Sequence, residues 1–154
     1  MPLDTPHVAG RPCSVAAALE IVGDRWSLLI VREVLFGNRR FAALARNTGA
    51  PRDRLAARLK HLVAVGVLEQ REYQTNPPRS EYYLTRAGRE LWPVIQTLRE
   101  WGDRYAVETP PVVFRHHDHE LRVGRICAEC GEPVRAADVH RASRAPGWTL
   151  AGPE

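Results

Sequence analysis

Residues 37–66 read GNRRFAALARNTGAPRDRLAARLKHLVAVG, and this stretch decides the fold. Its first half predicts a short helix with Phe41 and Leu44 on the inner face. Residues 48–51, Thr-Gly-Ala-Pro, end that helix, and a proline suits the first turn of the next one. In the second helix apolar residues recur at helical spacing, at Leu55, Leu59, Leu62 and Val63. The stretch therefore predicts two short helices joined by a tight turn.

The same stretch carries most of the chain's excess positive charge. Residues 37–60 contain one acid, Asp53, and seven basic residues, namely Arg39, Arg40, Arg46, Arg52, Arg54, Arg58 and Lys60. The formal net charge of the whole chain is +4, whereas residues 106–154 hold 6 basic against 7 acidic residues. The charge is thus concentrated on a turn and one helix face. An arginine-rich solvated surface is the simpler alternative, because the chain is rich in arginine.

Helical patterns precede this stretch. Val15, Leu19 and Val22 predict an amphipathic helix that begins near Pro12–Cys13 and ends at Gly23. Residues 26–36 are apolar nearly all round, which predicts a buried central helix, and Asp24 is placed to cap it.

A hairpin and a long helix follow. Residues 67–73 and 81–85 predict two strands around a polar tip at 75–79. Thr85 then caps a predicted last helix that runs to Tyr105, with Pro93 as a kink. Trp92 and Val94 add apolar surface beside the inner face of that helix, which indicates a dimer contact.

Composition excludes several classes of protein. The chain has 154 residues, of which 44% are hydrophobic and 26% charged, as expected for a folded domain rather than a disordered tail. It contains no run of 18 apolar residues, and three cysteines are too few for a secreted disulfide scaffold. We therefore expect a cytoplasmic protein. Hydrolase and phosphate-binding motifs are absent from the sequence, so an enzyme is disfavoured.

Three helices, a turn, a basic helix and a basic hairpin form the order of a winged helix-turn-helix. Such a helix fits the major groove, where arginine reads guanine, and basic turns neutralise phosphates. Residues 13–105 closely resemble the HxlR family of bacterial winged helix-turn-helix regulators, relatives of the MarR type. The matching positions are Cys13, Gly23-Asp24-Arg25-Trp26, Leu35-Phe36-Gly37, Arg40-Phe41, Leu55, Arg58-Leu59, Gly66-Val67-Leu68, Pro78-Arg79, Glu81-Tyr82, Leu84-Thr85, Gly88 and Trp101-Gly102.

The resemblance implies a mainly α fold with a small β-hairpin wing, a homodimer formed through the first and last helices, and an inverted-repeat operator. Repression relieved by a small-molecule or redox signal would follow. We divide the chain into an arm (1–11), the DNA-binding domain (12–109) and a small extension (110–154) that is expected to be β-rich.

The recognition helix implied by position is 51–65. We expect Arg52, Asp53 and Arg54 to approach bases, while Arg58 and Lys60 contact phosphate. Two alternatives stay open: Arg58 forms an ion pair or covers the apolar face, and Asp53 orients a neighbouring arginine.

Residues around this helix are expected to contribute further contacts to DNA. Arg39 and Arg40 precede a helix N-terminus, which suits phosphate. At the wing tip, Arg79 suits the minor groove, with Asn76 beside it. Tyr82 and Tyr83 alternate along a strand, and we expect one in the core and one on the surface.

Cys13 has two interpretations. Family members that sense oxidants or electrophiles use a cysteine at this position, and a helix N-terminus with Arg11 nearby lowers a thiol pKa. The alternative is a small buried packing residue. An effector pocket, if one exists, is expected near Trp26, Trp92 and Trp101, although tryptophans there also suit a plain core.

The extension contains a Cys-x-x-Cys pair, Cys127 and Cys130. With two of the histidines, for which His119 and His140 are the candidates beside His116 and His117, this pair would complete a structural zinc site. A metal-free β-hairpin and a dithiol redox pair are the alternatives. As a second function, the extension would recruit a partner in a redox- or zinc-dependent manner.

Overall fold

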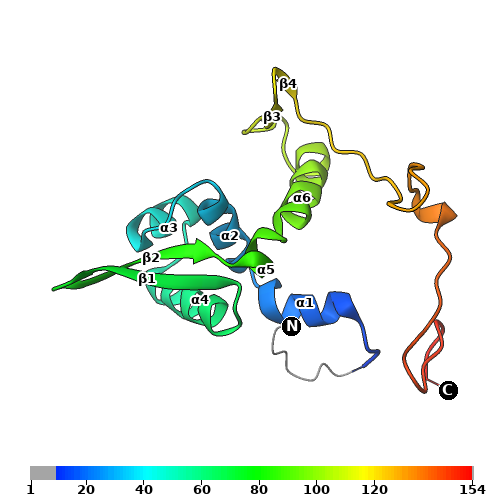
Figure 1. The fold of residues 1–154 in the computed structure, drawn as a ribbon, viewed down its shortest axis with the longest axis horizontal. Helices are drawn as coiled ribbons and strands as arrows, with labels where there is room; N and C mark the ends of the chain where they lie inside the picture. Colours follow the sequence, from blue (N-terminus) through cyan, green and yellow to red (C-terminus); the bar gives the residue numbers. More distant parts are fainter. Residues whose placement is uncertain (1–9, 154) are drawn as a thin grey trace. The chain divides into compact units, whose positions relative to one another are not determined.

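The computed structural model describes residues 10–153, so the predicted N-terminal arm lies almost wholly outside the described residues. Of the described residues, 10–102 form one compact unit and 103–153 a second. The first unit contains α1 (Ser14–Val22), α2 (Ser27–Leu35), α3 (Phe41–Thr48), α4 (Arg52–Ala64), β1 (Leu68–Thr75), β2 (Pro78–Leu84), α5 (Arg86–Arg89) and most of α6 (Trp92–Tyr105) (Figure 1).

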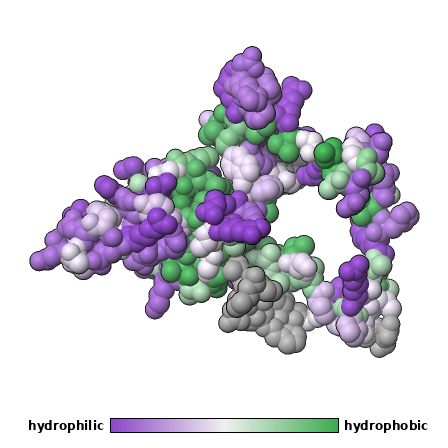
Figure 2. Space-filling view, viewed as in Figure 1, coloured by the Kyte–Doolittle hydropathy of each residue, from purple (hydrophilic) through white to green (hydrophobic). Residues whose placement is uncertain are grey.

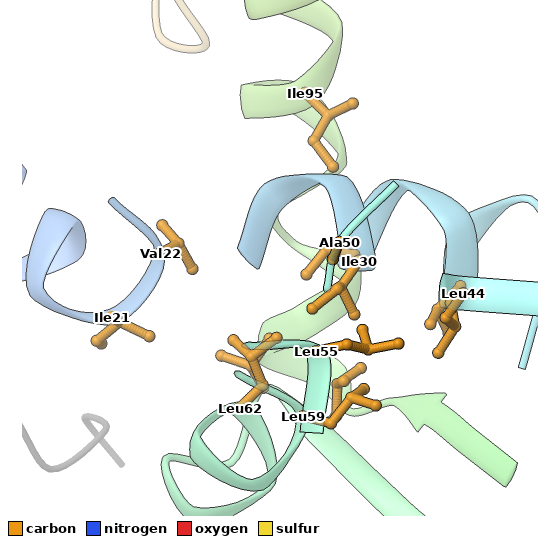
Figure 3. Close-up of a cluster of buried hydrophobic side chains, with 13 residues drawn as sticks. Ile21, Val22, Ile30, Leu44, Ala50, Leu55, Leu59, Leu62 and Ile95 are labelled. Carbon is orange, nitrogen blue, oxygen red and sulfur yellow. The ribbon is translucent and has the colours of Figure 1, made fainter. Parts of the chain in front are cut away.

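The core of the first unit surrounds α2, as predicted. Ile30 and Val31 are fully buried there, and Leu44 of α3 is also fully buried. The inner face of α4 adds Leu55 and Leu62, with side chains that converge on those of α2 and α3 (Figure 3). This shared core fixes α4 against its neighbours and turns the other face of α4 to solvent.

A tight turn links α3 to α4. Gly49 at the end of α3 has φ of +69°, a left-handed conformation that glycine adopts without steric cost. The Thr48 hydroxyl donates to the Leu44 carbonyl at 2.7 Å and accepts the backbone N–H of Ala50 at 3.2 Å. Pro51 then precedes the first residue of α4. These contacts fix the predicted helix-turn-helix geometry.

The hairpin of β1 and β2 forms the wing, and its turn is shorter than predicted. Leu68 faces Leu84 at the base and Thr75 faces Pro78 at the far end, so only Asn76 and Pro77 lie outside the strands. The predicted five-residue tip was wrong because backbone pairing continues through polar residues. Between Glu72 and Gln74 the pairing register shifts by one residue, because a bulge leaves an extra residue on β1.

The predicted last helix is two helices. Thr85 caps α5 by accepting the backbone N–H of Gly88 at 3.2 Å. A Cβ at Gly88 would lie 2.3 Å from the Val67 carbonyl oxygen, so α5 packs tightly on the end of the wing. Pro93 lacks the N–H that would continue the ladder, and it occupies the first turn of α6 instead of a kink.

The second unit has little regular structure. Its elements are β3 (Arg115–His116), β4 (His119–Glu120) and a 3-10 turn at Ala136–Asp138. Isolated bridges join Ile126 to Pro133 and Trp148 to Pro153. β pairing therefore predominates among its regular elements, while most of its residues are irregular. Across the described part of the chain, no helix is both long and apolar enough to span a membrane.

Candidate nucleic-acid interface

The first turn of α4 presents charged side chains to solvent. The Arg54 and Asp53 side chains are 73% and 81% exposed, and Arg54 Nε lies 4.0 Å from Asp53 Oδ2. That distance is too long for a hydrogen bond, so the two side chains form only a weak, solvent-exposed ion pair. Arg52 is exposed, and its guanidinium lies 5.0 Å from the centre of the Phe41 ring on α3. Two arginines thus project from one helix end.

Arg58 forms an ion pair with Asp24, which is the alternative to a phosphate contact that the sequence left open. Its Nη1 lies 3.4 Å from Asp24 Oδ2. The Asp24 carboxylate also accepts the backbone N–H of Trp26 at 2.9 Å and of Ser27 at 3.2 Å, the capping role predicted for it. Partial burial opposes ionisation of Asp24, but the bonds from Ser27 and Trp26 and the charge of Arg58 outweigh it and lower its pKa. Arg58 therefore ties α4 to the start of α2.

Sequence reasoning missed a buried acid that positions α3. Glu33 is 5% exposed, and its carboxylate accepts from Arg32 Nη2 at 2.8 Å, Asn38 Nδ2 at 2.7 Å and Asn47 Nδ2 at 2.9 Å. These bonds join α2, the following turn and α3. The available signal was a glutamate beside an arginine inside a mostly apolar helix, since a buried carboxylate needs partners.

The segment before α3 is attached to the wing. Arg40 Nε lies 2.9 Å from Glu81 Oε1, and the backbone N–H of Tyr82 donates to the Arg39 carbonyl at 2.9 Å. Hydrogen bonds from Arg40 and from the Tyr83 hydroxyl lower the pKa of Glu81. The wing and the N-terminus of α3 therefore form one framework.

The remaining predicted DNA-binding residues lie on the same unit. Lys60 is exposed on α4, while Asn76 and Arg79 are exposed at the end of the wing. Figure 2 shows hydrophilic residues covering the wing. Tyr82 packs against the core, where burial raises its pKa, and Tyr83 occupies the other face of the strand. The two tyrosines lie on opposite faces of the strand as predicted, but Tyr83 is half-buried and not fully exposed.

Comparisons with known proteins agree with this arrangement. The family model of the HxlR-like helix-turn-helix matches residues 21–110. The chain belongs to the HxlR family. A relative in Mycobacterium tuberculosis, an uncharacterised HTH-type transcriptional regulator, is 48% identical over 130 residues, which is 82% of each chain.

Solved structures extend the likeness. The crystal structure of PA1607, a candidate transcription factor, matches with a TM-score of 0.74 and 34% identity over 86% of this chain and 95% of its own. The redox regulator HypR in its oxidised form matches with a TM-score of 0.55 and 29% identity over 62% of this chain and 99% of its own. The protein is therefore a transcriptional regulator of the HxlR family with a winged helix-turn-helix DNA-binding domain, and not an enzyme.

Cys13 directly precedes α1 and is exposed, which differs from the alternative of a buried packing residue. The backbone N–H groups of Ala16 and Val15 and the charge of Arg11 lower the pKa of its thiol. A larger fraction of this thiol is therefore ionised than of an ordinary cysteine at neutral pH.

The Cys-x-x-Cys pair of the extension forms a compact turn. The backbone N–H of Gly131 donates to the Cys127 carbonyl at 2.8 Å, and the N–H of Cys127 donates to the Glu132 carbonyl at 2.9 Å. Bonds from the backbone of Cys130 and Glu129 and from the Cys130 side chain lower the pKa of the Cys127 thiol.

The predicted zinc ligands are not assembled in this structure. Within residues 10–153, no group of three or more Cys, His, Asp or Glu side chains is placed to hold a metal ion, so His119 and His140 do not join the cysteine pair. The rings of His116, His117 and His119 cluster with one another instead, with centroids 4.1 to 6.4 Å apart. Zinc binding stays a prediction, which metal analysis of the purified protein tests.

Of the three tryptophans predicted to line an effector pocket, Trp101 lines an apolar groove. This groove on α6 is lined by Trp101 and four neighbours on that helix, and its lining includes neither Trp26 nor Trp92. Trp26 instead packs against the core.

Proposed function

We propose that the protein is a homodimeric repressor that binds an inverted-repeat operator through α4 of each protomer. The observation that carries this proposal is the exposed first turn of α4, where Arg52 and Arg54 project from a helix whose opposite face is buried. A helix held this rigidly presents its arginines to the major groove at little entropic cost. In two-fold symmetric dimers the half-sites lie about 10 bp apart, centre to centre.

The apolar face of α6 supports dimer formation. Val94, Leu98, Trp101 and Tyr105 lie on one side of that helix and are 48%, 53%, 59% and 65% exposed. On α1, Val15 and Leu19 are 66% and 57% exposed. Apolar side chains gathered in this way on helix faces are typical of a protein–protein contact. A second copy of the chain would cover them.

In vitro selection of bound duplexes from a random pool tests the proposal. We expect an inverted repeat to be enriched and to bind with the stoichiometry of two chains per duplex. Binding without enrichment of any sequence, at any salt concentration, would reduce the interface to a non-specific basic surface and contradict the proposal.

A redox signal at Cys13 is the effector that the observations favour. The thiol is exposed with a lowered pKa, and the structurally similar HypR is described as a redox regulator. With hydrogen peroxide, the Cys13 thiolate forms an S–O bond as the O–O bond breaks. This step gives a sulfenic acid and hydroxide, and it moves two electrons from sulfur to the oxidant.

A peroxide titration followed by operator binding tests this step. We expect peroxide to weaken operator binding by the wild-type protein, and a reductant to restore it. The Cys13→Ser variant should bind the operator like the wild-type protein and ignore peroxide. Cys127→Ser with Cys130→Ser is the matched control, because it retains Cys13. An unchanged peroxide response in Cys13→Ser would exclude Cys13 as the sensor.

A further inference from the structure

A pocket of about 320 Å³ lies where the base of the wing meets α2 and α5. Val34 and Leu35 of α2 and Leu84 of β2 form an apolar wall, while Arg39, Arg71 and Arg89 contribute positive charge. The volume is at the small end of the range for ligand pockets. A mixed apolar and cationic lining of this size suits a small amphipathic anion.

Positive charge exceeds negative charge in the lining of the pocket, which contains three arginines and one acid. Glu69 is the one acid in the lining, and it accepts a hydrogen bond from Arg71. Arg89 Nη1 donates to the Leu84 carbonyl at 2.8 Å, which holds that side chain in place without neutralising it. A guanidinium has five N–H donors, so Arg89 retains others for a ligand.

Two of the arginines form cation–π contacts with the ring of Tyr83. The guanidinium carbons of Arg39 and Arg71 lie 4.4 and 4.3 Å from the centre of that ring. The Tyr83 hydroxyl donates to Glu81 at 2.8 Å, and Glu81 is already paired with Arg40. Each guanidinium is attracted to the electron-rich ring, and the positive charge gathered around Tyr83 favours an added anion.

We propose that this pocket binds a small organic carboxylate with a single aromatic ring or a short branched aliphatic body. The carboxylate would lie against Arg39 and Arg89, where arginine forms paired hydrogen bonds. The body would cover the apolar wall made by Val34, Leu35 and Leu84. An uncharged analogue, in which an amide replaces the carboxylate, would lose the attraction to the arginines.

The pocket also has a route to DNA affinity, a consequence that rests on the proposed function. Arg39 is one of the residues expected to contact phosphate, and its carbonyl accepts the N–H of Tyr82 on the wing. A carboxylate that engages Arg39 would compete with a DNA phosphate for the same guanidinium. Occupation of the pocket would therefore weaken DNA binding.

Calorimetric titration of the full chain with benzoate, in the absence of DNA, tests the site directly. We expect saturable binding with one site per chain, and at least tenfold weaker binding of benzamide and of inorganic phosphate. Arg89→Gln should weaken benzoate binding at least tenfold. Arg86→Gln is the matched control, because Arg86 lies on the same short helix with its side chain 89% exposed and paired with Glu90.

Several outcomes would overturn the proposal. Equal binding of benzamide would exclude recognition of the carboxylate, and equal binding of phosphate would exclude the apolar wall. Undiminished binding by an Arg89→Gln variant with an unchanged melting temperature would exclude this pocket. Tenfold weaker DNA binding by Arg89→Gln without benzoate binding by the wild-type protein would assign the pocket to a DNA phosphate instead.

A second titration, of a labelled DNA duplex by fluorescence anisotropy, tests the coupling. Benzoate should weaken DNA binding by the wild-type protein and leave that of Arg89→Gln unchanged. Benzoate binding with no effect on DNA affinity would overturn the coupling alone. A protein that binds benzoate but no DNA sequence would contradict the proposed function and leave the carboxylate site standing.

Discussion

The two units of the chain differ in what holds their side chains in place. In the first unit, thirteen apolar residues form a buried core beneath the DNA-binding surface. Among residues 103–153, by contrast, no residue is buried, and local backbone bonds and bridges provide the order. A site built on the first unit is therefore preorganised by packing, whereas a site on the second needs a ligand or partner to assemble it.

The largest loss of stability is expected when a side chain inside the core of the first unit is truncated. Leu62 is fully buried on α4. Leu62→Ala removes packing contacts and leaves a cavity, so it should lower the free energy of unfolding by about 2–5 kcal/mol. Urea denaturation at a fixed protein concentration measures this change. A loss below about 1 kcal/mol would mean that the core does not hold α4 as described.

A smaller loss is expected at the buried carboxylate. Glu33→Gln replaces one acceptor oxygen with an amide group that faces donors of Arg32, Asn38 and Asn47. It should therefore lower the free energy of unfolding by about 1–3 kcal/mol. Glu20→Gln is the matched control, because Glu20 is exposed on α1. Equal stability of the two variants would show that the Glu33 bonds do not position α3.

The capping carboxylate gives a pH-dependent effect. Because the folded state lowers the pKa of Asp24, its contribution is present above the unfolded pKa and is lost as pH falls through the folded value. Asp24→Asn should therefore cost about 1 kcal/mol at pH 7 and progressively less below about pH 4. Urea denaturation of both proteins across this range measures the gap. A difference in free energy of unfolding that stays constant with pH would show that the charge of Asp24 does not contribute to stability.

The smallest effect is expected in the extension. Ile126 is 67% exposed, so Ile126→Ala should change the free energy of unfolding by less than about 0.5 kcal/mol. The same urea experiment measures it. A loss comparable to that of Leu62→Ala would show that this unit buries Ile126 in solution and would break the contrast between the two units.

The sequence predicts the first unit well because its signals are local. Helical spacing at Leu55 and Leu59, the Gly49–Pro51 break and the capping of α2 by Asp24 each act within a few residues. The division between α5 and α6 escaped prediction: Pro93 marks the first turn of α6 locally, but the close approach of Gly88 to Val67 that fixes α5 is a tertiary contact. Part of the Glu33 network also depends on tertiary contact, because its partner Asn47 comes from α3.

The candidate DNA interface was also predictable only where the signals are local. Exposed arginines on α4 follow from the spacing of the leucines, so their placement was predictable. Whether an arginine pairs with an acid is decided by tertiary contacts, and Arg58 with Asp24 is such a case. In the extension, ligand spacing alone does not bring His119 or His140 to the cysteine pair, because no core fixes the chain between them.

We propose above that the exposed first turn of α4 reads DNA sequence. The most direct test is the affinity of Arg54→Ala for the selected operator and for an unrelated duplex, measured by fluorescence anisotropy at one salt concentration. We expect the affinity to fall by about 5- to 100-fold on the operator and by much less on the unrelated duplex. Equal losses on both duplexes would contradict it, because Arg54 would then contact only the phosphate backbone.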